Sequence, residues 1–138
     1  MARLSDNQAA FLRDNPFVGV ATTLRSDGSP HSTPVWVEAD AEGNPTFNTA
    51  RGRAKPRHIE NDPRVALTVV DPQNPFRWLS VSGTAALVDE GAVEQIDRLS
   101  QKYLDKTPYP WHSPDETRVS VRISVDQVDE LGIDTQAG

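Results

Sequence analysis

The strongest constraint on the fold is a series of short segments in which larger apolar residues alternate with smaller or polar ones. A period of two gives each segment two different faces, as in a β-strand. In the first segment, Val18, Val20 and Leu24 share one face, and Gly28 in the turn that follows is free to take a positive φ. The same pattern predicts six strands, at residues 17–25, 31–39, 45–50, 64–70, 77–88 and 119–125.

Three further segments carry helical signals. Ser5 and Gln8 are spaced as a capping box, in which each side chain bonds the other residue's backbone amide, so a short helix is expected to follow. Residues 53–61 have Pro56 in the first turn, where its missing amide costs little. Apolar residues at helical spacing predict an amphipathic helix over residues 90–104. We therefore expect two or three short helices beside the strands.

Two special residues indicate how the strands join. Proline cannot donate to a ladder of hydrogen bonds, so the strand at 31–39 needs an edge or a bulge at Pro34. Gly83 permits a sharp bend of the kind that closes barrels. A curved antiparallel sheet of this size tends to close, because closure removes exposed edges. The prediction for residues 1–138 is a single, mainly β domain built as a small antiparallel barrel, with an open α+β sheet as the alternative.

Composition narrows the classes of function. The chain of 138 residues is long enough for one hydrophobic core. Its net charge of -6 argues against nucleic acid as a partner, because binding to the phosphate backbone needs a basic surface. It has no cysteine, and therefore no disulfide, thiol nucleophile or zinc–cysteine site. No apolar run has the length of a membrane span, and residues 1–15 lack the apolar region of a signal peptide, so we expect a cytoplasmic protein without a membrane partner.

Side chains able to catalyse a reaction unaided are few. The three histidines have no metal-binding spacing and we predict no metal site; His58 is interpreted as a surface residue, and His31 and His112 as candidates to line a pocket. The sequence contains no nucleophile motif and no glycine-rich nucleotide motif. Asp126 and Asp129 are interpreted as part of a solvated tail. Redox chemistry on this chain would therefore depend on a cofactor.

The sharpest local signal is a basic segment that follows the third predicted strand. Residues 48–59 read Asn-Thr-Ala-Arg-Gly-Arg-Ala-Lys-Pro-Arg-His-Ile, so a strand end, a glycine turn and a helix start lie among cations. Free amides at a helix N-terminus attract anions, and arginine adds bidentate contacts to phosphate. A solvated helix face that balances Glu60 and Asp62 is the alternative. The position of the cations at a turn into a helix favours a phosphate site, to which Thr49 could add a hydroxyl donor.

The same segment resembles a known family. Residues 53–67 are similar to the R-x-K-x-x-N-h-x-x-D-P-R-V segment of the pyridoxamine-5′-phosphate-oxidase-like split-barrel family, with His58 where the family often has Asn. The hairpin at residues 19–36 and the strand that begins near Trp78 resemble the family's opening and later strands. The likeness runs from about residue 4 to residue 128 and is greatest to the F420-dependent branch found in actinobacteria.

The resemblance implies a homodimer of six-stranded split barrels with cofactor clefts between the subunits. The cofactor would be the deazaflavin coenzyme F420, with FMN as the alternative. The resemblance assigns its phosphate to Arg53 and Lys55, and adds Arg57 as a further candidate for the same role. Trp78 and, less directly, Trp111 would approach the ring from the second subunit. Further residues that the resemblance assigns to cofactor binding come from three segments: Thr33, Pro34, Val35, Phe47, Asn48, Thr49, Ala50, Ala54 and Pro56.

The implied activity is that of an oxidoreductase in which reduced coenzyme F420 transfers hydride to a small organic acceptor, with His31 or Tyr109 as candidate proton donor. Three alternatives are an FMN-dependent oxidase or reductase, a carrier that binds the cofactor without catalysis, and a structural dimer module. Oxidation of pyridoxamine phosphate itself is not expected, because the chain is short. The acceptor depends on the loops at residues 71–76 and 106–114, whose conformation the sequence does not define.

Overall fold

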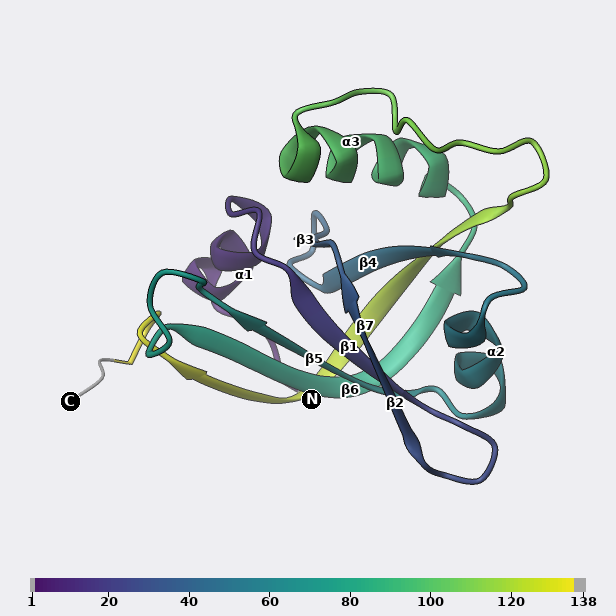
Figure 1. The fold of residues 1–138 in the computed structure, drawn as a ribbon. Helices are drawn as coiled ribbons and strands as arrows, with labels where there is room; N and C mark the ends of the chain where they lie inside the picture. Colours follow the sequence, from purple (N-terminus) through teal and green to yellow (C-terminus); the bar gives the residue numbers. More distant parts are fainter. Residues whose placement is uncertain (1, 136–138) are drawn as a thin grey trace.

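A computed structural model of the chain describes residues 2–135, which form one antiparallel sheet of seven strands and three helices (Figure 1). The strands are β1 (Gly19–Leu24), β2 (Pro30–Val35), β3 (Val37–Ala39), β4 (Pro45–Ala50), β5 (Arg64–Val70), β6 (Trp78–Val88) and β7 (Arg118–Leu131). The helices are α1 (Asp6–Arg13), α2 (Ala54–Asn61) and α3 (Ala92–Leu104). The order across the sheet is β2-β1-β5-β6-β7-β4-β3.

The two edge strands of this order, β2 and β3, are consecutive in the chain, with Trp36 alone between them. Because neighbouring Cα atoms are about 3.8 Å apart, the two edges must lie close together, and the sheet curls into a half-barrel with a split between its edges (Figure 1). The predicted fold class is confirmed. The sheet has seven strands rather than six because Trp36 divides the segment predicted as one strand. Pro34 lies in the edge strand β2, as its missing amide requires.

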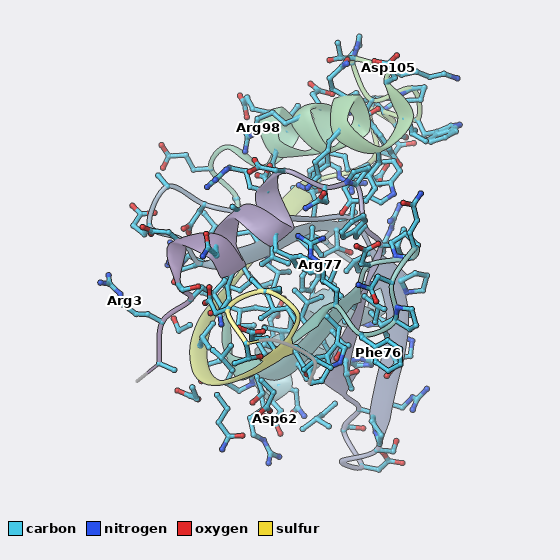
Figure 2. The ribbon with its side chains drawn as sticks, turned by 90° about the vertical axis from the view of Figure 1, so that its left-hand side faces the viewer. Arg3, Asp62, Phe76, Arg77, Arg98 and Asp105 are labelled. Carbon is cyan, nitrogen blue, oxygen red and sulfur yellow. The ribbon has the colours of Figure 1, made fainter. Side chains whose placement is uncertain are left out.

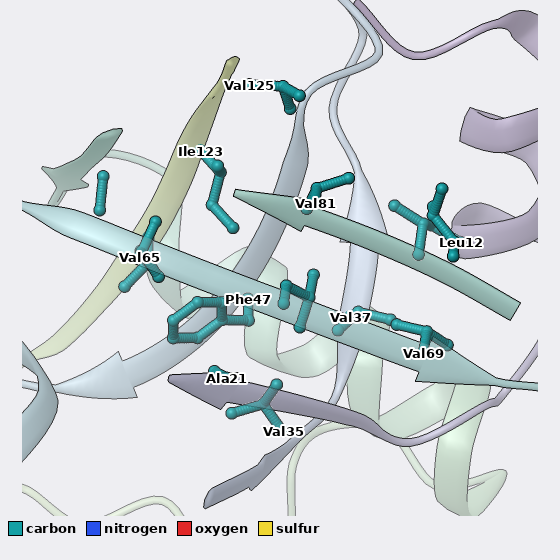
Figure 3. Close-up of a cluster of buried hydrophobic side chains, with 14 of the residues drawn as sticks. Leu12, Ala21, Val35, Val37, Phe47, Val65, Val69, Val81, Ile123 and Val125 are labelled. Atoms are coloured by element: carbon teal, nitrogen blue, oxygen red, sulfur yellow. The ribbon is translucent and has the colours of Figure 1, made fainter. Parts of the chain in front are cut away.

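The core fills the inside of the curled sheet (Figure 3). Its fully buried side chains include Val37, Phe47, Leu67, Leu79, Val119, Val121 and Ile123. Helix α1 adds Phe11 and Leu12 to the same cluster. Burying a side chain of this size contributes about 1.5–3 kcal/mol, so this cluster is the main source of stability.

The register of β6 against β7 shifts at Gly83, which pairs with Val125 and leaves Asp126 as an extra residue on β7. A bulge of this kind bends the strands locally and increases their twist. A Cβ added to Gly83 would lie 1.9 Å from the carbonyl oxygen of Ser124, so the backbones approach too closely for any side chain. The bend predicted at Gly83 is therefore present, and glycine is required there by close backbone contact.

Strand β7 is longer than the strand predicted at residues 119–125, since it continues to Leu131. Asp126 and Asp129 lie in this continuation with exposed side chains, so their interpretation as part of a solvated tail is wrong. The second half of β7 pairs with the first half of β6 as far as Trp78. Backbone pairing with a long partner strand decides the structure here, while the acidic side chains simply face solvent.

The helices are fixed by specific hydrogen bonds. The predicted capping box of α1 is confirmed: Ser5 Oγ accepts from the Gln8 amide at 3.1 Å, and the Ser5 amide donates to Gln8 Oε1 at 2.9 Å. Helix α3 is attached to the edge of the sheet by Tyr103, whose hydroxyl donates to Phe17 O at 2.7 Å and accepts from the Val37 amide at 2.9 Å. Within residues 2–135, no helix is long and apolar enough to cross a membrane.

Several apolar side chains on the outside of the sheet are exposed. Val18, Val20 and Val70 are 51%, 44% and 41% exposed, and Phe76 in the loop after β5 is 64% exposed (Figure 2). The inward face of β1 is made by small residues such as Ala21, which is fully buried. Val18, just before β1, and Val20 within it therefore belong to an outer apolar face of the sheet rather than to the core.

Candidate functional site

A cavity of about 350 Å³ lies in the split of the sheet, between β2 and β4 and against α3. Strand β2 contributes Pro34 and Val35, and strand β4 contributes Asn48 and Thr49. The other lining residues come from the turn into α2, from α3 and from the connections around them: Val18, Trp36, Arg53, Lys55, Ile96, Leu99, Tyr109 and Arg118. The cavity thus combines apolar walls with three cations, and its volume lies at the lower end of the range for small-molecule sites.

The turn from β4 into α2 brings two of these cations to the cavity. Strand β4 ends at Ala50, and Gly52 takes a φ of 90°, which glycine adopts without strain. Arg53 is the N-cap of α2 and its side chain makes no bond to the amides of the first turn. Pro56 lies in that turn, as predicted. The helix therefore begins with amides open to an anion, and its dipole adds to the positive charge of the side chains.

Lys55, in the first turn of α2, reaches across the split to β2. Its Nζ donates to Thr33 Oγ1 at 2.9 Å. The side chain is half-buried, and this burial, together with the charge of Arg53, lowers the pKa of Lys55 from its ordinary value. A bound anion would favour the charged amine, because an opposite charge nearby stabilises it.

Arg118, the first residue of β7, is a third cation of the cavity and was not predicted. It is only 7% exposed. Its Nη1 donates to Glu116 Oε1, and the same carboxylate oxygen accepts from Arg53 Nη2 at 2.7 Å. Its Nε donates to Asn48 Oδ1 at 2.8 Å. One carboxylate therefore holds two of the three cations at the cavity.

No local pattern in the sequence marks Arg118, because it lies 70 residues from Asn48. The useful signal is strand pairing. Arg118 is opposite Ala50, the last residue of β4, so the start of β7 lies beside the turn into α2. An assignment of β7 as the partner of β4 would have brought Arg118 to the basic segment.

Asn48 and Thr49 both line the cavity, and their contact with a cofactor stays a prediction. Asn48 is also part of the framework, because its Nδ2 donates to Ala92 O at 2.8 Å and to Gln95 Oε1 at 2.7 Å. Its carbonyl oxygen accepts from Arg118, so the amide is bonded at both ends. Asn48 therefore fixes the start of α3 against the cavity, while Thr49 is buried and lines the cavity.

The remaining predicted site residues do not line this cavity. Phe47, Ala50 and Pro56 are buried, and Ala54 is half-buried. Arg57 is exposed on α2. These residues shape the elements that carry the cavity; direct contacts between them and a cofactor stay a prediction.

Trp78 lies apart from the cavity in the same chain. It begins β6, where it pairs with Val70 on one side and Leu131 on the other. It is half-buried. Its predicted role requires a second subunit, and it stays a prediction.

Aromatic side chains form one wall of the cavity. Trp36 stacks on Tyr103 with centroids 5.4 Å apart and meets Tyr109 edge-on at 6.2 Å. Tyr109 meets Trp111 edge-on at 5.5 Å, and the Arg118 guanidinium lies 5.5 Å from the Tyr109 centroid. Planar rings arranged in this way present faces and edges on which a planar ligand can pack.

The histidines are placed elsewhere. His58 is not a free surface residue: its Nδ1 lies 2.8 Å from Thr23 Oγ1, and its ring meets that of His31 edge-on at 5.1 Å. His112 Nε2 lies 2.7 Å from Asp97 Oδ1. Neither His31 nor His112 is among the cavity lining. In the part of the chain that the structure describes, no group of three or more acidic or histidine side chains could hold a metal ion.

The donor set fits a ligand with a phosphate and a planar ring system. Arginine and lysine side chains with open helix amides are the groups that hold phosphate. Glu116 already offsets part of the desolvation of the buried Arg118 guanidinium, and a bound phosphate would add a second anion beside it. The apolar and aromatic walls suit a flat ring. Fold and site together define a half-barrel protein with a cleft lined by cations and aromatic side chains.

Comparison with known proteins agrees with that class. The family model described as pyridoxamine 5′-phosphate oxidase matches residues 4–132. The match covers nearly the whole chain, so this protein belongs to the pyridoxamine 5′-phosphate oxidase family. The family predicted from the basic segment and the opening hairpin is confirmed.

Individual relatives add detail. The chain is 32% identical over 128 residues to the F420H2-dependent biliverdin reductase of Mycobacterium tuberculosis, an alignment that covers 91% of this chain and 87% of that one. A solved structure described as an F420 reductase has a TM-score of 0.73 and 29% identity, covering 87% of this chain and 94% of that chain. A putative pyridoxamine 5′-phosphate oxidase from Listeria innocua has a TM-score of 0.65 at 22% identity, covering 88% and 93%, and shows a shared fold.

Proposed function

We propose that this protein is an oxidoreductase that uses reduced coenzyme F420 for hydride transfer to a small organic acceptor. The observation that carries the proposal is a cation-lined cavity in a chain that is 32% identical, over 91% of its length, to an F420H2-dependent reductase. The 29% identical F420 reductase structure supports the same cofactor.

In this proposal Arg53, Lys55 and Arg118 bind the phosphate-bearing end of the cofactor. All three line the cavity, and Glu116 keeps the two guanidinium groups near each other. Charge-assisted hydrogen bonds of this kind are about twice as strong as neutral ones. Arg57 is not needed for this role, because it lies outside the cavity lining.

The other cavity residues orient the ligand and exclude water. When bound, the cofactor supplies the hydride, so the protein needs no nucleophile of its own. Pro34 and Val35 offer an apolar surface on β2, and Ile96 and Leu99 of α3 cover the opposite side. Holding two reactants in a fixed orientation in a dry cavity is the main contribution that such side chains make to rate.

We further propose that the protein works as a homodimer. The exposed valines Val18 and Val20 lie next to the cavity, and Val18 belongs to its lining. Val70 and Phe76 extend the apolar surface along the next strand and its loop. A second copy packed on this face would bury apolar area and cover the open side of the cavity.

Replacing Lys55 tests the proposed cofactor site. Lys55→Ala should weaken coenzyme F420 binding at least about tenfold, which corresponds to about 1.4 kcal/mol, the loss of one charge-assisted contact. Arg57→Ala, on the same helix but outside the cavity lining, is the matched control and should change affinity less than about twofold. Fluorescence titration measures both. Unchanged binding and unchanged turnover in Lys55→Ala would contradict the proposal.

A further inference from the structure

Two contacts join helix α2 to the edge strand β2. Lys55 donates to Thr33, and the ring of His58 packs edge-on against that of His31 at 5.1 Å. Residues three apart on a helix share a face, and residues two apart on a strand share a face. His58 therefore lies one helical turn from Lys55, and His31 lies beside Thr33. The histidine pair adjoins the anion site without lining the cavity.

The ionisable groups that act on the pKa of His58 all belong to basic residues. Burial is the largest cause that lowers the pKa of His58 from its ordinary value, followed by His31, Arg25, Arg57 and Lys55. These groups come from β2, from the end of β1 and from α2 itself. The free protein therefore keeps His58 neutral at physiological pH.

Asp27, exposed in the turn after β1, interacts with Arg25 at the edge of this cluster. The other strands packed against α2, which are β1, β4 and β6, carry no titratable side chain between their ends. The nearest acidic residues in sequence are already paired: Glu60 lies 3.5 Å from Arg51, and Asp62 lies 2.7 Å from Arg64. An anion in the cavity would place a negative charge beside Lys55, one helical turn from His58.

The hydrogen bond of His58 tolerates either protonation state. Its Nδ1 lies 2.8 Å from Thr23 Oγ1, and a hydroxyl can donate to a bare ring nitrogen or accept from a protonated one. Protonation therefore does not break this contact. The buried Nδ1 of His31 has no hydrogen-bond partner in the described structure, so the contact between the two histidines is one of ring packing.

We propose that His58 is a titratable part of the anion site, neutral in the free protein at physiological pH and more readily protonated from solvent when an anion occupies the cavity beside Lys55. The identity of the natural ligand rests on the proposed function, but the linkage holds for any anion at that position. Because the complex then binds more protons than the free protein, affinity for the anion rises as pH falls through the titration of His58. His58 would affect the anion through its charge, from a position one helical turn beyond Lys55, and is not a catalytic residue.

The first test follows the ring of His58 by NMR in the protein without cofactor. Sulfate is the probe, because its charge is constant between pH 5 and 8, and chloride at equal ionic strength is the reference. Sulfate should raise the pH midpoint of His58 by about half a pH unit, the effect of a charge roughly one helical turn away in a partly screened site. In Lys55→Ala the effect of sulfate on His58 should disappear.

An unchanged or lowered His58 midpoint, while the amides of the first turn of α2 show bound sulfate, would overturn the inference. If neither sulfate nor coenzyme F420 binds at all, the anion site is refuted and the inference falls with it.

The second test uses coenzyme F420. Affinity of the wild-type protein should rise about twofold to threefold between pH 7.5 and pH 5.5, because a shift of half a pH unit allows at most about threefold. His58→Gln should show no rise, since the amide cannot titrate. Comparing each protein with itself across pH removes any uniform loss from altered folding. Binding with no pH dependence in the wild type would overturn the inference and leave the proposed function intact. A sulfate effect on His58 without any binding of coenzyme F420 would support the inference about His58 and contradict the proposed function.

Discussion

Lys55 on helix α2 and Thr33 on edge strand β2 are joined by a 2.9 Å hydrogen bond that crosses the split of the sheet. The same split is bridged in the chain by Trp36, which connects the two edge strands. The cavity is therefore a product of the way the sheet curls, and its cations are held on elements whose relative position the curl determines. Arg53 and Arg118, linked by Glu116, make a second bridge between α2 and the start of β7.

The bulge opposite Gly83 should be essential for this curl. Gly83→Ala puts a Cβ 1.9 Å from Ser124 O, where backbone must move, so we expect a loss of about 3 kcal/mol or more of unfolding free energy. Gly28→Ala is the matched control: it has a φ of 84° but no atom within 4 Å of the new Cβ, and should cost about 1 kcal/mol. Urea denaturation measures both. Equal losses would show that close contact at Gly83 is not the determining factor.

Lys102 should stabilise the junction of three elements. Its Nζ donates to Leu12 O at 2.8 Å, near the end of α1, and also to Val37 O in β3. Lys102→Met keeps most of the side-chain volume but loses these bonds, and should lower the free energy of unfolding by about 1–3 kcal/mol. Lys106→Met, at an exposed position, is the control and should change it by less than about 0.5 kcal/mol. A loss of the same size in both variants would contradict the assignment.

The same residue predicts a pH dependence. Burial lowers the pKa of Lys102 from 10.5 to about 8, although Glu38 and Asp14 act in the opposite direction. Between pH 8 and pH 10.5 the unfolded chain therefore binds more protons at this position, and the contribution of Lys102 to stability rises with pH in that window. The difference in unfolding free energy between wild type and Lys102→Met should increase across the window. A difference that decreases would show that the charged amine is favoured by folding.

The proposed homodimer predicts different results for two exposed valines. Val20, 44% exposed on the outer face of β1, belongs to the proposed interface, whereas Val93, 50% exposed on α3, does not. Val20→Glu should give a monomer in light scattering and weaken coenzyme F420 binding, because a charge cannot be buried unpaired in the interface. Val93→Glu should leave both unchanged. A dimer that survives Val20→Glu would place the interface elsewhere.

The fold was largely predictable because its signals are local. The capping box of Ser5 and Gln8, the proline in the first turn of α2 and the alternation in β5 act over a few residues. Two features depended on distant partners. Trp36 divides a strand because it stacks on Tyr103, 67 positions further along the chain. The second half of β7 is polar on its exposed face, and pairing with β6 makes it a strand.

The residues of the candidate site show the same difference between local and distant signals. Lys55 and Arg53 were predicted as candidate phosphate ligands because the strand end, the glycine turn and the helix start lie in one short segment of the sequence. Arg118 was missed, since only the pairing of β7 with β4 brings it to that turn. His58 was misjudged for a similar reason, because its partners Thr23 and His31 belong to the first hairpin, far from it in sequence.

The most direct test of the account is a titration of the purified protein with coenzyme F420 and, separately, with FMN, followed by ligand fluorescence. The account predicts micromolar or tighter F420 binding, about -8 kcal/mol or better, and clearly weaker FMN binding. A preference for FMN would move the protein to flavin-dependent chemistry on the same fold. Binding of neither ligand would contradict the central claim that Arg53, Lys55 and Arg118 form a cofactor site.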